Sequence, residues 1–367
     1  MTALTQAPTA SQASCPNPRR HALLPLTGVR FVAAFYVVLS HSRGWLQHRL
    51  PLPKALDNFL INGPLAVSFF FLLSGFILAY TYETPFVGIR SHVKFWVARF
   101  ARIYPVYLLS LLLLVPFQFH SLDHRTALTV LVMLQAWNPW RAELTGAWNY
   151  PAWSLSVEAF FYLCFPFLQS WFATASRRTL YVLVAVFAFV TVFGHTSYES
   201  LGIWNPRSYA AILIPLPLLR IPEFILGMVA GNFFVRFGAL RQKTWMSLIA
   251  AVSSLIVLCS TAGPWVSLAA LPFLLFIYCL ASSDDPVTAL FRGPIMVLLG
   301  GASYAVYLLQ LPVRDWVRVS FEWSALNRYV PDAPLTPIIL VLFSILIFKY
   351  WEEPLRRQIR RVFASRL

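Results

Sequence analysis

Residues 26–42 read LTGVRFVAAFYVVLSHS, an apolar run of the length that a membrane-spanning helix needs. The run carries one charge near its start, Arg30, and one ionisable ring near its end, His41. On an α-helix these two residues lie about 1100° apart, roughly three turns plus 20°, and about 16 Å apart along the axis. Both side chains therefore share one face. Because charged groups are costly in lipid, this face is expected to look into the protein interior or a hydrated cavity.

A second interpretation of the same stretch stays open. Arg30 would then be an interfacial anchor at the cytoplasmic end of the helix, and His41 the first polar residue past its outer end. Under the first interpretation the histidine is a catalytic candidate, since an imidazole can take up and release a proton near neutral pH.

Apolar runs of this kind recur along the whole chain. It has 367 residues, of which 58% are hydrophobic and only 12% charged, and its mean hydropathy is +0.65. Soluble domains of this length rarely contain so few charges. We therefore predict an all-α polytopic transmembrane helix bundle of about ten helices, at residues 23–42, 64–82, 103–119, 152–172, 179–194, 210–235, 245–261, 265–282, 294–312 and 336–351.

The basic residues indicate the orientation of the bundle. Most of the 29 Lys and Arg residues fall in segments that face the cytoplasm if the N-terminus lies there. Both termini are therefore predicted to be cytoplasmic, and the net charge of +15 needs no nucleic acid to explain it. Residues 1–20 are predicted to form a disordered cytosolic tail and 21–355 one membrane domain. The last helix is expected to stop near Pro354, and 356–367 to form a basic tail that touches anionic lipid. The four cysteines have no metal-ligand spacing.

Arg99 and Arg102 form the first polar pair that needs an explanation. They stand before the third predicted span, three residues apart and so on one helical face. The pair could belong to the cytoplasmic excess of positive charge. We favour anion binding, because two planar guanidinium groups on one face suit phosphate and pyrophosphate.

The fourth predicted span carries a carboxylate within an apolar helix. Glu158 lies about two turns inside the helix, and Tyr162 lies one turn further on the same face. A carboxylate at that depth is expected to be protonated or paired with an Arg or His of another helix, and a purely structural ion pair remains possible. Three further polar or amphipathic residues are predicted to lie at the outer mouth: Trp153, Ser154 and Ser156.

The sixth and ninth predicted spans also contain polar or small residues. Arg220 and Glu223 could satisfy each other, as a structural pair or as part of a site. Gly227 and Gly231 have the spacing that allows close helix packing. In the ninth span, polar side chains three or four residues apart are predicted to line one stripe: Ser303, Tyr304, Tyr307 and Gln310.

Taken together and in this order, these segments resemble the acyltransferase-3 family of bacterial integral-membrane acyltransferases. The family O-acylates surface polysaccharides, lipopolysaccharide O-antigen, nodulation factors and some antibiotics. The resemblance extends from about Leu23 to Arg361. Its parts are Arg30-x10-His41, FFFLLSGFILAY (69–80), Arg99-x-x-Arg102 followed by IYPVY, WSLSVE ending at Glu158, RIPEFILG from Arg220, LGGASYAVYL from Leu299, and WEEPLRR near the end.

The resemblance implies an enzyme of the bacterial cytoplasmic (inner) membrane. It would pass an acyl group, usually acetyl, from cytoplasmic acyl-CoA to a hydroxyl of an exopolysaccharide, O-antigen or other glycan, free or lipid-linked. Its partners could include polysaccharide-assembly proteins. By the same resemblance, His41 is the catalytic histidine with Arg30 as its companion, Arg99 and Arg102 bind the donor, and Glu158 is the family's carboxylate. Glu158 could orient the histidine ring or stabilise an imidazolium.

Some positions depart from the family pattern. Thr27 and Ala159 replace acids that many members have, and Gln310 replaces a histidine, so that the acid-base role falls more heavily on His41. No esterase-like domain follows the last span, which predicts a transferase that acts alone or with a separate partner. The outer segments 120–150 and 313–336 are expected to decide the acceptor.

Other functions stay open at this point. Intramembrane Arg, His and Glu also mark secondary transporters and flippases, which could move a glycan intermediate. Such a protein should show matching polar segments in its two halves, and this sequence shows none. An inactive family member acting as an assembly subunit, or an enzyme that acylates a small secondary metabolite, is also compatible with the sequence.

Overall fold

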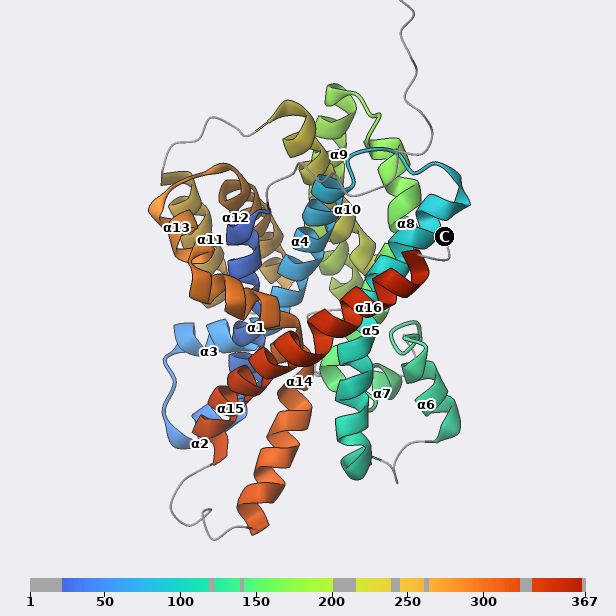
Figure 1. Ribbon diagram of the computed structural model, residues 1–367. Helices are drawn as coiled ribbons and strands as arrows, with labels where there is room; N and C mark the ends of the chain where they lie inside the picture. The colour runs from blue at the N-terminus through green and yellow to red at the C-terminus, as the bar shows by residue number, and fades with distance from the viewer. Residues whose placement is uncertain are drawn as a thin grey trace, which may run out of the picture.

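The computed structural model describes residues 22–118, 123–138, 142–200, 216–238, 245–260, 264–323 and 332–364, and in these ranges every regular element is a helix (Figure 1). The first half contains α1 (Leu24–His41), α2 (Arg43–Arg49), α3 (Lys54–Ile61), η1 (Gly63–Leu65), α4 (Ala66–Thr81), α5 (Gly88–Gln118), α6 (His124–Leu131), α7 (Ala142–Thr145), η2 (Tyr150–Ala152) and α8 (Trp153–Phe172). The second half contains α9 (Arg177–Ser200), α10 (Pro217–Phe237), α11 (Trp245–Ser260), η4 (Pro264–Ala269), α12 (Ala270–Ser282), α13 (Pro286–Arg292), α14 (Pro294–Trp323), α15 (Asp332–Ile347), η6 (Phe348–Glu352) and α16 (Glu353–Ala364).

Each predicted apolar span coincides with a helix over its described residues, which confirms an all-α polytopic bundle. Eight helices of the described part are long and apolar enough to cross a membrane. The segment Ser267–Ser282, which comprises the end of η4 and α12, meets α13 at a bend of 80°, and the pair gives a ninth span if it is counted as one. Helix α11 is apolar but shorter. The count of about ten and the cytoplasmic termini stay predictions. The predicted tail 1–20 and the start of the span 210–235 lie outside the described residues.

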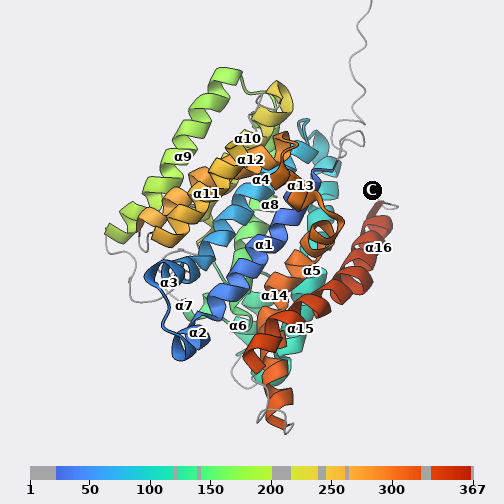
Figure 2. The same ribbon diagram turned by 90° about the vertical axis from the view of Figure 1, so that its left-hand side faces the viewer.

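Helix α1 occupies the middle of the bundle, with α4 on one side and α14 on the other (Figure 2). Small residues allow these close approaches. A Cβ atom on Gly300 would overlap the backbone of Thr27, and one on Gly227 would overlap the backbone oxygen of Leu72 in α4. A Cβ on Gly231 would be 2.6 Å from the oxygen of Phe76. The predicted packing role of Gly227 and Gly231 is therefore confirmed, and the partner of their helix is α4.

In two of the spans that continue through prolines, a side chain from another segment satisfies the carbonyl that the proline frees. The ninth span was expected to end at residue 312, but α14 passes Pro312 and continues to Trp323. The side chain of Asn149 donates a hydrogen bond of 3.1 Å to the carbonyl of Leu308, four residues before this proline. In α8, which contains Pro166, the indole of Trp96 donates in the same way to the carbonyl of Tyr162, at 3.0 Å.

The last span also continues further than expected. A stop near Pro354 was predicted, but the chain passes from α15 through η6, a short π-helix, into α16. Pro354 is the second residue of α16, where a helix needs no backbone N–H, so the prediction of a stop was wrong. Residues 356–364 of the predicted tail are thus helical, and α16 lies along α5 (Figure 1).

Candidate active site

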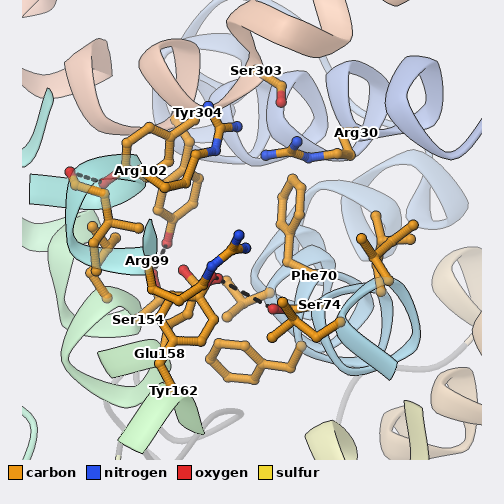
Figure 3. Close-up of a pocket in the computed structure, with 18 residues that line it drawn as sticks. Arg30, Phe70, Ser74, Arg99, Arg102, Ser154, Glu158, Tyr162, Ser303 and Tyr304 are labelled. Carbon is orange, nitrogen blue, oxygen red and sulfur yellow. Dashed lines mark hydrogen bonds between the residues drawn. The ribbon is translucent and has the colours of Figure 1, made fainter. Parts of the chain in front are cut away.

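A half-open cavity with an empty volume of about 890 Å³ lies among α1, α4, α5, α8 and α14. Figure 3 shows the guanidinium groups of Arg30, Arg99 and Arg102 converging on it from α1 and α5. Nine side chains that were singled out in the sequence line the cavity: Arg30, Arg99, Arg102, Ser154, Glu158, Tyr162, Ser303, Tyr304 and Tyr307. Six others do not line it: His41, Trp153, Ser156, Arg220, Glu223 and Gln310.

Arg99 is placed by aromatic rings. Its Cζ atom lies 5.6 Å from the ring centre of Phe95 and 5.9 Å from those of Tyr82 and Tyr162. Such stacking holds a guanidinium without consuming its hydrogen-bond donors. Its buried Nε atom has no hydrogen-bond partner among the residues that the structure describes. Arg99 is therefore oriented and still has donors available for a ligand.

Arg102 is placed by a carboxylate. It forms an ion pair with Glu352, a fully buried residue at the end of the π-helix, and it stacks on Tyr304 with its Cζ 5.6 Å from the ring centre. A π-turn changes the direction in which one side chain points and is common at functional sites. Glu352 was not among the site residues predicted from the sequence, although a carboxylate at the end of an apolar span is the signal that could have found it.

Glu158 is held by hydroxyl groups. The hydroxyl of Tyr162 donates to its Oε1 atom, and that of Ser74 on α4 approaches the same atom at 3.4 Å. Among the residues that the structure describes it makes no ion pair, so the alternative of a direct pair with an Arg or His of another helix is not observed. Arg30 acts on Glu158 electrostatically across the cavity. Ser74 is a second contact that the sequence analysis missed.

Polar side chains of α14 continue from the cavity toward the end of α1. Tyr304 donates a hydrogen bond of 2.6 Å to the carbonyl of Ile103, and Tyr307 donates one of 2.9 Å to that of Pro151. The hydroxyls of Tyr307 and Ser154 lie 2.9 Å apart. The stripe begins at Ser303 beside Arg30 (Figure 3) and ends at Gln310, about 10 Å further along the helix.

His41 lies at this second end of the stripe. Its Nδ1 atom is 2.7 Å from Oε1 of Gln310, and its ring meets that of Tyr150 edge-on, with centres 6.2 Å apart. The amide nitrogen of Gln310 donates to the carbonyl of Tyr307 at 2.7 Å, which fixes the amide oxygen as the atom facing the histidine. An amide oxygen only accepts hydrogen bonds, so Nδ1 carries the proton and Nε2 keeps a free lone pair.

This geometry corrects the expected role of Glu158. The carboxylate contacts Tyr162 and Ser74 and not the histidine, so it does not orient the ring; Gln310 does. A second contact fixes the same end of the bundle. Arg43, two residues after His41, donates two hydrogen bonds to Asp57 of α3, at 2.7 and 2.9 Å. These bonds hold the pKa of Asp57 below its ordinary value.

We expect Gln310→Leu to lower kcat by at least about tenfold, because the loss of a ring-orienting partner has large effects in other histidine-based sites. The KM for the donor should stay unchanged, since Gln310 does not line the cavity. Gln310→Glu keeps an acceptor oxygen beside Nδ1 and should retain most of the activity. Steady-state kinetics of the three proteins checks this. Equal losses in both variants would contradict a positioning role.

The remaining candidates lie outside the lining of the cavity. Arg220 and Glu223 are buried 2.8 Å from each other in α10, and Arg220 also donates to Ser68 of α4 at 2.9 Å. Neither lines the cavity, which favours the structural alternative. Trp153 is buried beside the cavity, and the hydroxyl of Ser156 donates to the carbonyl of Met133 at 2.6 Å.

Comparison with known proteins identifies the family. The acyltransferase domain family matches residues 25–351. The chain is 31% identical over 317 residues to acyltransferase MdmB of Streptomyces mycarofaciens, which covers 81% of this chain and 80% of that protein. It is 37% identical over 102 residues to protein 2 in the picA locus of Rhizobium radiobacter, covering 26% of this chain and 45% of that protein. No solved structure matches. The chain therefore belongs to the acyltransferase-3 family and is an integral-membrane acyltransferase.

Proposed function

We propose that the protein transfers an acyl group, acetyl in the first instance, from acyl-CoA to a hydroxyl of a surface or lipid-linked glycan. The observation that carries the proposal is the arrangement of two centres in one bundle. Arg30, Arg99 and Arg102 line a cavity, and a polar stripe of α14 leads from it to His41. One centre suits a charged donor, and the other suits proton transfer.

The donor assignment rests on the chemistry of the cavity. Coenzyme A carries phosphate groups at one end and the thioester at the end of a long flexible arm. Guanidinium groups bind phosphates through paired hydrogen bonds. With the nucleotide at the arginines, the arm can extend along the α14 stripe toward His41. Arg99, oriented by its aromatic neighbours, is the side chain best prepared for this contact.

His41 acts as the general base in this proposal. Its Nε2 atom takes the proton of the acceptor hydroxyl, whose oxygen forms a bond with the acyl carbon as the carbon–sulfur bond breaks. The sulfur leaves as a thiolate and takes up a proton. Transient transfer of the acyl group to Nε2 is the alternative route, and it needs the same tautomer. Glu158 serves the donor centre, where its charge balances part of the arginine cluster.

Membership of the acyltransferase-3 family supports transfer over transport. The contact with Gln310 also argues against an inactive subunit, because this residue holds the histidine in a tautomer able to accept a proton. We place the donor centre at the cytoplasmic face of a bacterial inner membrane and His41 toward the outer face, as the distribution of basic residues favours. Polysaccharide-assembly proteins would be natural partners there.

The O-acetyl content of the host's surface and secreted glycans tests this proposal. Proton NMR would be recorded on the wild type, a deletion strain, and the deletion strain complemented with His41→Ala. Acetyl signals should vanish on deletion and stay absent with the variant, and the missing signal would identify the acceptor sugar. An unchanged glycan pattern with a changed small metabolite would overturn the glycan acceptor. A change in glycan export alone would point to transport.

A further inference from the structure

The C-terminal helix α16 is held beside the donor cavity by a buried ion pair. Glu352 pairs with Arg102, which lines the cavity, and α16 begins at the residue that follows Glu352. The helix then runs along α5, the helix that carries Arg99 and Arg102 (Figure 1). The ion pair therefore fixes the face of α16 that is turned toward the cavity.

Arg356 and Arg360 continue this face. They follow Glu352 by four and eight residues, which places them about 40° and 80° around the helix from it. Arg356 is partly buried and Arg360 is exposed. Both interact electrostatically with Arg99 in the cavity. Arg356 also interacts with the other two cavity arginines, Arg30 and Arg102.

The opposite side of α16 carries a second pair of arginines. Arg357 donates a hydrogen bond of 2.6 Å to Glu353 on its own helix, and Arg361 lies about 180° from Glu352. Both are exposed. These two residues carry the same charge as Arg356 and Arg360 on the same helix, so they provide a matched control.

Three guanidinium groups line the cavity, and two more, on the face of α16 that follows from Glu352, interact with them electrostatically, so that five like charges repel one another. Carboxylates offset only part of this charge: Glu352 pairs with Arg102, and Glu158, held by hydroxyls, lines the cavity. Glu353 lies 3.9 Å from Arg356 but is bound more closely by Arg357. A ligand with several negative charges would resolve the repulsion. The five groups are those of Arg30, Arg99, Arg102, Arg356 and Arg360.

We propose that Arg356 and Arg360 of α16 form the outer part of the donor site and bind phosphate groups of the nucleotide portion of coenzyme A. The inference rests on the proposed function, because it takes acyl-CoA as the donor. It changes the role of the C-terminal segment from a surface tail to a wall of the binding site. Arg357 and Arg361 face away and take no part in donor binding.

Binding of coenzyme A to the full-length protein in phosphatidylcholine nanodiscs tests the proposal. Arg356→Ala/Arg360→Ala should raise the dissociation constant about tenfold or more, since charged hydrogen bonds to phosphate are lost. Arg357→Ala/Arg361→Ala should leave it unchanged. Pantetheine, which lacks the phosphates, should bind both variants and the wild type alike. Arg356→Lys/Arg360→Lys, which keeps the charge, should recover part of the affinity and guards against a folding defect.

The outcomes separate this inference from the proposed function. If the wild type binds coenzyme A and the Arg356→Ala/Arg360→Ala variant binds it equally well, the inference is overturned and the donor assignment stands. Equal weakening in both double variants would also overturn it, because general surface charge would explain the effect. If the weaker binding of the Arg356→Ala/Arg360→Ala variant appears only in nanodiscs that contain phosphatidylglycerol, the two arginines bind the phosphate of a lipid headgroup and not that of coenzyme A, which overturns the inference. A wild type that binds no coenzyme A would overturn the donor assignment and the inference with it.

Discussion

Replacing His41 with alanine is expected to reduce acyl transfer by about 10²- to 10⁴-fold, the usual contribution of a general base. The variant removes the Nε2 lone pair that Gln310 keeps available. The bundle should remain folded, because His41 is the exposed last residue of α1, at the end of the helix. The rate is measured as acceptor-dependent release of the coenzyme A thiol by purified protein in nanodiscs.

The matched control for this experiment is His48→Ala. His48 is another exposed histidine, seven residues further on in α2, and it has no place in the proposed mechanism. Its replacement should leave the rate unchanged. Full activity of the His41→Ala protein, at normal abundance in the membrane, would remove His41 from the mechanism.

Arg220→Leu is expected to destabilise the protein by about 3–5 kcal/mol, because it leaves Glu223 as a buried charge without its cation. Both side chains are almost completely excluded from solvent. The double variant Arg220→Leu/Glu223→Leu removes both charges and should recover most of the stability and the transfer rate, as apolar replacements of buried pairs often do. Thermal unfolding in detergent and kinetics in nanodiscs measure the two quantities.

An exposed ion pair provides the contrast. Arg292 and Asp284 are 2.6 Å apart at the surface, where salt bridges contribute little to stability, and Arg292→Ala should leave the unfolding midpoint unchanged. The alternative left open by the sequence was that Arg220 and Glu223 take part in the site. A double variant that folds like the wild type but transfers no acyl group would establish that alternative.

The sequence predicted well those properties that one helix determines alone. The shared face of Arg30 and His41 follows from their spacing, as does the polar stripe of α14. The arginine-lined cavity could be foreseen in part, since the depths of Arg99, Arg102 and Glu158 in their helices can be estimated from the apolar periodicity. The structure brings these side chains together with Arg30 in one cavity.

Relations between helices could not be predicted in this way. The depth of a residue in its helix does not give the rotation of that helix against its neighbours. For this reason Glu158 was considered as the residue that orients His41, and Gln310 was interpreted only as the loss of a possible second base. Gln310 stands where many family members have a histidine, and it cannot act as a base. Its amide oxygen nevertheless accepts a hydrogen bond from Nδ1 of His41. Glu352 was missed because its side chain reaches Arg102 from a π-turn, which regular helical spacing does not reveal.

The most direct test of the account is to measure donor binding and acyl transfer in parallel on two variants. The central claim is that the donor binds at the arginine-lined cavity while acyl transfer takes place at His41, at the other end of the polar stripe of α14. We predict that His41→Ala binds coenzyme A with the affinity of the wild type but transfers the acyl group at least about 10²-fold more slowly, and that Arg99→Ala loses affinity for the donor. If His41→Ala instead loses donor binding together with transfer, the two centres are one site, and the account is contradicted.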